Sequence, residues 1–260
     1  MGSATTQALA AQAEALAGAT VDLDTARELF AAARAVAGSP ALSGALADPA
    51  AAPEARSALV ARVFGSLSPT TQSLLSTAAA QRWSSQGELI DGIEELAIRA
   101  AAKADQGDLE GELFRVSRIV AENPELELAL GSRLGDGAAK GALMESLLGG
   151  RASEGTTLVV SSLVQQPRER RVRALLSRAI RIVAAQRARK VATVTTAAPL
   201  SAAQAERLAT ALSRTYGGEV TINPVVDPAI VGGVRVQIAD DVIDGSIASR
   251  LAGVRQQLVG

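Results

Sequence analysis

An internal repeat constrains the fold of the first two thirds of this chain more than any other feature. When the sequence is displaced by 84 positions, 17 of the 58 residues in 24–81 coincide with identical residues in 108–165. Structural signals coincide as well, because Pro40 and Pro124 each follow a residue suited to capping a helix. We therefore expect two copies of one succession of short helices, each opening at the aspartate with which its range begins.

Two more helices are expected beside the first copy. Residues 3–16 are rich in alanine and place Leu9 and Leu16 on a sparse apolar face. Residues 88–103 carry apolar side chains at helical intervals. This second helix would end the first bundle and also begin the second, so a continuous helix here would couple the bundles rigidly.

Composition indicates helical cores without large side chains. The chain has 260 residues, 48% of them apolar but only 2% aromatic. A length of this order suits two or three compact domains. Cores made of Ala, Leu, Val and Ile favour closely packed helices, so the first two thirds should be helical bundles.

The absence of cysteine and histidine excludes most catalytic and metal chemistry. With neither residue type in the sequence, thiolate nucleophiles, disulfides, imidazole acid–base catalysis and the usual transition-metal ligand sets are all excluded. The glycine-rich run 131–137 follows no predicted strand and is therefore interpreted as a loop, not a phosphate-binding turn. We predict no catalytic residues, no cofactor and no metal site.

A basic segment spans residues 168–190. Its apolar residues keep helical phase, so the charges should lie mainly on the remaining, solvated circumference. Nucleic-acid binding is an alternative, but a net charge of −1 and the scarcity of aromatic residues count against it. The charged residues of the segment are Arg168, Arg170, Arg171, Arg173, Arg178, Arg181, Arg187, Arg189 and Lys190.

The last seventy residues predict a small α/β module. A strand is expected through residues 191–195, and Ser201 with Gln204 forms a capping box that opens a helix. A second strand should begin near Glu219. Turn residues and alternating Val and Ile then predict a hairpin of two strands over 234–243.

The end of this module resembles a known family signature. An acidic residue before proline, a Gly-Gly pair and an Ile-Asp-Gly-Ser ending follow an apolar strand. In spacing and residue choice, they resemble the C-terminal signature of the delta subunit of F-type ATP synthases, a family related to mitochondrial oligomycin-sensitivity-conferring protein. The residues that carry the resemblance are Asp227, Gly232, Gly233, Ile243, Asp244, Gly245 and Ser246.

The resemblance extends from about residue 94 onward, and the additional N-terminal copy is similar to the enlarged delta region of actinobacteria. It implies a non-catalytic stator subunit of the proton-translocating ATP synthase, peripheral at the cytoplasmic face of the bacterial cell membrane. Such a subunit links the N-terminal helices of the α subunits in the catalytic head to the C-terminal region of subunit b. Neither nucleic acid nor direct membrane insertion is implied. A free-standing helical-repeat adaptor is the alternative function.

The resemblance also implies two contact regions. The α-subunit contact would involve the first copy, which has its own free opening helix, or a second set of residues in the second copy; packing in the core is the alternative for both sets. The first set is Leu9, Leu16, Leu74 and Leu75, and the second is Leu96, Ala100, Leu158 and Val159. The b-subunit contact would involve a helical stripe that could instead pack on the chain's own sheet, namely Ile247, Arg250, Leu251, Val254 and Leu258.

The sequence therefore predicts a mainly α protein with a small C-terminal α/β domain. Two tandem helical bundles, at 1–104 and 105–189, precede a short β-sheet with flanking helices at 190–260. The basic segment joins the two parts, and the resemblance makes attraction to acidic helices of subunit b a further role for it.

Overall fold

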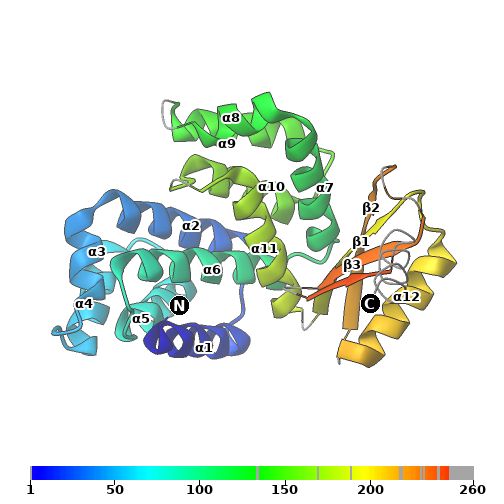
Figure 1. The fold of residues 1–260 in the computed structure, drawn as a ribbon. Coiled ribbons are helices and arrows are strands. Elements are labelled where there is room, and N and C mark those ends of the chain that lie inside the picture. The colour runs from blue at the N-terminus through cyan, green and yellow to red at the C-terminus, as the bar shows by residue number, and fades with distance from the viewer. Residues whose placement is uncertain are drawn as a thin grey trace, which may run out of the picture. The chain divides into compact units, whose positions relative to one another are not determined.

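The computed structural model describes residues 2–245 except 133, 134, 169, 188, 217, 218, 229, 231, 239 and 240. The chain forms two compact units, Met1–Val183 and Ala184–Gly260 (Figure 1). The first unit is helical and the second contains a four-stranded sheet, which confirms the predicted fold class. The finer division of the first unit at residues 104 and 105 stays a prediction.

The first unit contains both copies of the repeat. Its helices are α1 (Ser3–Gly18), α2 (Leu23–Gly38), α3 (Pro40–Ala47), α4 (Pro53–Val63), α5 (Pro69–Ala80), α6 (Gln86–Ala104), α7 (Leu109–Glu122), α8 (Pro124–Gly131), α9 (Gly137–Leu148), α10 (Glu154–Gln165) and α11 (Val172–Gln186), the last running beyond the boundary of the unit.

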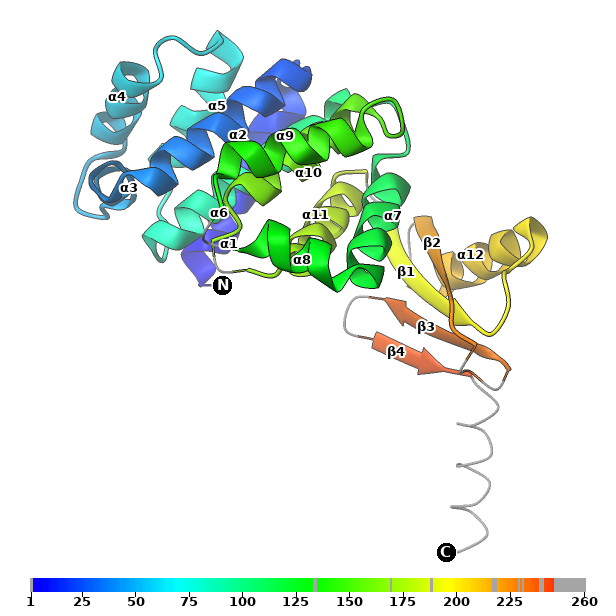
Figure 2. The ribbon, with the colours of Figure 1, turned by 90° about the horizontal axis from the view of Figure 1, so that it is seen from above.

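Helix α6 belongs to both copies. Displaced by 84 positions, α1 falls on residues 87–102, which lie inside α6. The packing repeats accordingly, since α1 and α2 each contact α5 in the first copy, while α6 and α7 each contact α10 in the second. Helix α6 also packs against α2, and α10 contacts both (Figure 2). The predicted single, shared helix is confirmed.

The caps show where the two copies depart from a gapless alignment. Ser68 caps α5 and Ser153 caps α10, a separation of 85 positions, so one residue is inserted ahead of α10. Helix α7 is capped by Asp108, as predicted, but α2 is capped by Asp22 and not by Asp24. The capping aspartate is the one whose carboxylate accepts a hydrogen bond from a backbone amide of the first helical turn, here that of Thr25. The sequence alone does not distinguish Asp22 from Asp24 in this role.

The single tryptophan lies in the core of the first unit. Trp83 is buried against Gly92 of α6, where any added side chain would overlap the indole ring. Its Nε1 donates a hydrogen bond to the Ala78 carbonyl oxygen at 2.9 Å. Most surrounding core positions are Leu, Ile, Val and Ala, as the composition predicts. Trp83 therefore provides a fluorescence signal that reports on this unit.

The second unit is a mixed sheet with one described helix. Its elements are β1 (Arg189–Thr196), α12 (Ala202–Tyr216), β2 (Glu219–Val226), β3 (Val234–Ile238) and β4 (Asp241–Asp244). The strand order is β2-β1-β3-β4, with β1 parallel to β2 and antiparallel to β3, and β3 antiparallel to β4. Ser201 and Gln204 form the predicted capping box, with hydrogen bonds of 2.9 and 3.3 Å. The predicted hairpin is confirmed as β3 and β4.

Among the described residues, no single helix is both long and apolar enough to cross a membrane. Helices α2 and α3 satisfy the length and composition criteria only when taken together, across a bend of 103°.

Candidate partner-binding surfaces

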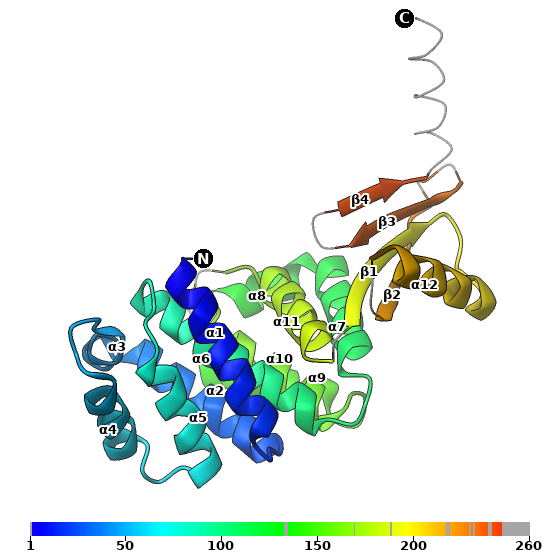
Figure 3. The same cartoon turned by 90° about the horizontal axis from the view of Figure 1, so that it is seen from below.

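The predicted α-subunit contact residues of the first copy lie on α1 and α5, which pack side by side (Figure 3). Leu16, Leu74 and Leu75 are buried, and Leu9 is half-buried. These side chains therefore hold the helices of the first copy together, and Leu9 alone among them retains substantial exposure. Their role in binding a partner stays a prediction.

The predicted contact residues of the second copy are buried as well. Leu96, Ala100, Leu158 and Val159 all belong to the core. The apolar stripe that packs one helix on another is the same feature that would receive a partner helix. Sequence periodicity therefore could not separate a core role from a binding role in either copy.

Hydrogen bonds connect both ends of helix α1 to helix α6. Near its N-terminus, Thr5 donates a hydrogen bond to Glu88. At its C-terminus, Lys103 Nζ donates to three carbonyl oxygens, those of Leu16, Ala17 and Ala19, at 2.8, 2.9 and 2.7 Å. The ammonium group adds hydrogen bonds at the end of the helix where carbonyls are left over, and it interacts favourably with the negative end of the helix dipole.

The middle of α1 has a polar residue in an apolar setting. Gln12 is 2% exposed, and neither its Oε1 nor its Nε2 has a hydrogen-bond partner among the described residues. At the equivalent position, 84 residues later, α6 carries Leu96. An unsatisfied buried amide costs roughly 1–3 kcal/mol, so this position weakens the attachment of α1.

Three arginines of the basic segment pair with carboxylates of helix α6. Arg170 Nη2 lies 3.0 Å from both carboxylate oxygens of Glu94, and Arg178 Nη1 lies 2.8 Å from Glu94 Oε1. Arg168 pairs with Asp91, and Arg178 also reaches Glu95 at 3.3 Å. Such charge-assisted contacts are stronger than neutral hydrogen bonds and fix orientation.

The expectation of a mainly solvated basic face is therefore wrong for Arg168, Arg170 and Arg178. Their side chains are only 18–25% exposed, and the first two precede helix α11 instead of lying on it. The acidic partners lie more than 70 positions earlier, so no local pattern connected them. A signal was available in the spacing of Asp91, Glu94 and Glu95, which places three carboxylates on one face of α6.

A half-buried glutamate caps the fifth helix of each copy. Glu28 accepts hydrogen bonds from Ser68 and Thr71, with oxygen–oxygen distances of 2.6 and 2.5 Å. Burial alone would raise the pKa of Glu28, but these hydrogen bonds outweigh burial and hold the pKa below its ordinary value. In the second copy, Glu112 accepts hydrogen bonds from the backbone amide of Ser153 and the hydroxyl of Thr156, at 2.8 and 2.6 Å. Here too the hydrogen bonds outweigh burial and lower the pKa of Glu112.

The signature residues form a tight turn after β2. The amide of Asp227 donates to the Thr196 carbonyl oxygen at 2.9 Å, and the amide of Ile230 donates back to the Asp227 carbonyl at 3.1 Å, which confirms the predicted turn. Gly232 and Gly233 both have positive φ, 74° and 88°. Only glycine adopts such angles without strain, so this pair allows the chain to reverse into β3.

Residues 95–258 match the model of the ATP synthase delta (OSCP) subunit. The matched range begins inside α6, which opens the second copy, and continues through the signature turn.

This chain belongs to the ATP synthase delta (OSCP) subunit family.

Members from actinobacteria match the additional N-terminal copy as well. An ATP synthase subunit delta from Leifsonia xyli is 51% identical, with all of both chains covered. Another, from Streptomyces avermitilis, is 46% identical over 82% of this chain and 80% of its own length. A chain in the cryo-EM structure of the Toxoplasma gondii mitochondrial ATP synthase hexamer aligns over 64% of this chain and 96% of its own, at 22% identity and a TM-score of 0.38.

Of the remaining signature residues, Ile243, Asp244 and Gly245 lie among the described residues. Ile243 lies in β4 opposite Val236, and the amide of Gly245 donates to the Val234 carbonyl oxygen at 2.9 Å. Asp244 pairs with Arg235 in the strand register. The predicted b-subunit contact residues, Ile247, Arg250, Leu251, Val254 and Leu258, lie outside the described residues, as does Ser246.

Proposed function

We propose that this chain is a non-catalytic stator subunit of the proton-translocating ATP synthase. It links the N-termini of the α subunits in the catalytic head to the C-terminal region of subunit b, and it is peripheral at the cytoplasmic face of the bacterial membrane. The observation that carries the proposal is the family match over residues 95–258, together with 51% identity to a subunit delta along the whole chain.

The helical unit has the construction that a load-bearing connector needs. Its two copies share one continuous helix, α6, so no flexible joint separates them. The salt bridges of Glu94 hold the end of the second copy against the same helix. Close packing gives protein interiors low compressibility, so force applied at one copy would be transmitted to the other with little deformation.

The two contact regions need no active site. Among the predicted α-subunit contacts, Leu9 is the residue most able to touch a partner without disrupting the core, since Leu16, Leu74 and Leu75 are buried. The b-subunit contact is assigned to the apolar stripe of residues 247–258, on the strength of the sequence alone. Broad apolar surfaces with a few anchors supply the affinity of such interfaces.

Co-purification tests the assignment. The tagged full-length chain, recovered from gently solubilised membranes, should bring down the α, β and b subunits in constant ratio. Recovery of the chain without these subunits would reject the stator role and favour a free-standing adaptor. Nucleic-acid binding has less support, because Arg168, Arg170 and Arg178 are occupied by internal ion pairs.

A substitution tests the b-subunit contact separately. Leu251→Asp places a charge on the apolar stripe and should weaken binding to a soluble b fragment at least tenfold, measured by titration calorimetry. Gln256→Asp, on the opposite side of the same predicted helix, is the matched control and should bind like the wild type. Equal affinities for the two folded variants would reject this contact.

A further inference from the structure

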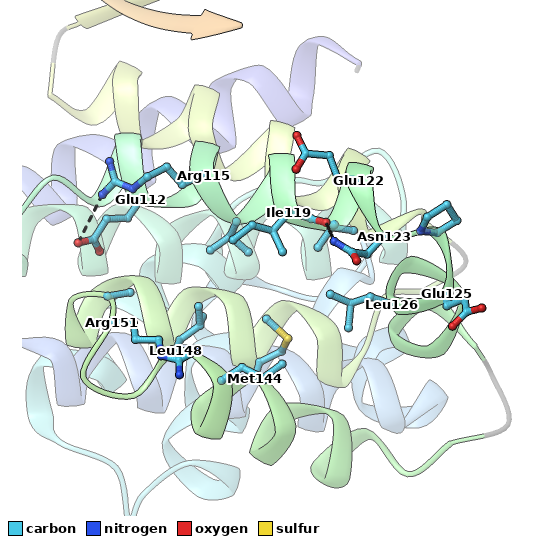
Figure 4. Close-up of a pocket in the computed structure, with 15 residues that line it drawn as sticks. Glu112, Arg115, Ile119, Glu122, Asn123, Glu125, Leu126, Met144, Leu148 and Arg151 are labelled. Atoms are coloured by element: carbon cyan, nitrogen blue, oxygen red, sulfur yellow. Dashed lines mark hydrogen bonds and ion pairs between the residues drawn. The ribbon is translucent and has the colours of Figure 1, made fainter. Parts of the chain in front are cut away.

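A groove runs between α7, α8 and α9 in the second copy (Figure 4). Its volume is about 900 Å³. The lining is apolar along the middle and charged at both ends. The apolar lining residues are Val116, Ile119, Val120, Leu126, Met144, Leu147 and Leu148.

The groove exposes large apolar side chains that no described residue covers. Ile119 of α7 is 51% exposed and Leu147 of α9 is 41% exposed, while Met144 of α9 is buried. The equivalent position of Ile119 in the first copy is Ala35. The added apolar surface is therefore a feature of the second copy and not a requirement of the repeated fold. Contiguous exposed apolar surface of this kind marks interaction sites.

The two ends of the groove carry opposite charge. Arg115 and Arg151 lie at one end together with Glu112, which leaves an excess of positive charge there, and Glu122 and Glu125 lie at the other (Figure 4). Arg115 contacts acidic neighbours at 3.5 and 3.8 Å, and Glu122 accepts from Arg118 at 3.0 Å. Neither the side chain of Arg151 nor that of Glu125 forms a hydrogen bond or ion pair with any described residue, so both charges are available to a partner.

The dimensions fit a short helix. The α7 wall of the groove runs from Glu112 to Asn123, and at about 1.5 Å per residue it is about 17 Å long, or about three helical turns. A helix dipole places partial positive charge at its N-terminus and partial negative charge at its C-terminus. The charges of Glu125 and Arg151 would therefore orient a helix in one direction only.

We infer that this groove binds a three-turn amphipathic helix from another polypeptide, antiparallel to α7. The apolar stripe of that helix covers Ile119 and Leu147, its N-terminus and any basic residues there lie at Glu125, and acidic residues of its last turn lie at Arg151. Helix-in-groove binding of this kind uses apolar anchors spaced three and four residues apart. A symmetric dimer formed through this groove fits less well, because two concave surfaces cannot fill each other.

Two stapled peptides test the inference on the full-length chain. Both have twelve residues, the same composition and leucines along one face; one carries lysines in its first turn and glutamates in its last, and the other has these charges exchanged. The staple keeps their helicity equal. The lysine-first peptide should bind at least tenfold more tightly in a fluorescence-anisotropy titration. Equal affinities, or no saturable binding of either peptide, would overturn the inference.

Variants of the groove sharpen the test. The double exchange Arg151→Glu with Glu125→Lys should reverse the preference between the two peptides, which a general apolar attraction would not do. Leu147→Ser should weaken the lysine-first peptide at least tenfold. Val63→Ser is the matched control, since Val63 occupies the equivalent position of the first copy and is 45% exposed. An equal loss in the control would contradict the assignment.

The other occupants give different results. If the chain's own residues 246–260 cover the groove, then the peptide binds only after they are removed. If a second copy covers it, then sedimentation equilibrium shows a dimer that Leu147→Ser dissociates. Either result would overturn the inference.

Discussion

Arg178 of α11 donates a hydrogen bond to Glu94 of α6, with Nη1 2.8 Å from Oε1. Glu94 is 7% exposed and also accepts two hydrogen bonds of 3.0 Å from Arg170. Because α6 is shared by both copies, this carboxylate connects the last helix of the second copy to the helix that opens it. Removing one member of such a cluster leaves the other charges buried and poorly paired.

We therefore expect Glu94→Gln to lower the free energy of unfolding by about 2 kcal/mol, since the amide keeps the shape but loses the charge. Urea titration followed by Trp83 fluorescence measures the change, because Trp83 is the single tryptophan and lies in this unit. Glu14→Gln, at an exposed position of α1, is the control. Equal midpoints for both variants would show that the cluster adds no stability.

The buried amide of Gln12 predicts a stabilising substitution. Gln12→Leu removes two unpartnered polar atoms and matches the leucine found at the equivalent position of α6. The free energy of unfolding should rise by about 1–2 kcal/mol. Gln7→Leu, at an exposed position of the same helix, should change it by less than about 0.5 kcal/mol. A loss of stability in Gln12→Leu would mean that the amide has a partner after all.

The approach of α9 to α10 depends on a glycine. A methyl group at Gly137 would overlap the backbone carbonyl of Gln165, whereas a methyl group at Gly131 would meet nothing within 4 Å. Gly137→Ala should therefore cost about 2 kcal/mol, as overpacking does, while Gly131→Ala should be neutral or slightly stabilising. Thermal unfolding of the two variants compares them directly, and similar melting temperatures would contradict the close packing of these helices.

The capping glutamates predict a dependence of stability on pH. Glu28 and Glu112 have folded-state pKa values below their ordinary value of 4.5, so the unfolded chain binds protons first as the pH falls. The stability they contribute is complete above pH 4.5 and is lost as the pH falls through the lowered folded-state values.

The double variant Glu28→Gln with Glu112→Gln should therefore be less stable than the wild type at neutral pH and should lose less stability on acidification. Urea midpoints across this pH range provide the measurement. Parallel pH profiles for the two proteins would show that other groups carry the acid sensitivity.

Local sequence signals predicted the elements that depend on local chemistry. The capping box at Ser201 and the glycine pair at 232 and 233 each specify backbone geometry within a few residues, and the structure has both. The cluster around Glu94 was not predictable in this way, because its members lie more than 70 positions apart and only the fold brings them together.

The candidate binding residues illustrate a different limit. Leu16 and Leu74 have the periodicity of a binding stripe, yet they are buried in the core. The same apolar periodicity serves packing within a bundle and binding of a partner helix, so it does not distinguish the two roles. The groove in the second copy corresponds to a difference between the two copies of the repeat. At the position where the first copy has Ala35, the second has Ile119, and a large apolar residue gained on a solvent-facing position is the kind of divergence between repeats that indicates a partner.

Proton pumping driven by ATP hydrolysis tests the stator assignment most directly. Inverted membrane vesicles from cells depleted of this chain should still hydrolyse ATP at the catalytic head but should acidify poorly, and adding the purified full-length chain should restore acidification. Undiminished pumping in the depleted vesicles would contradict the account.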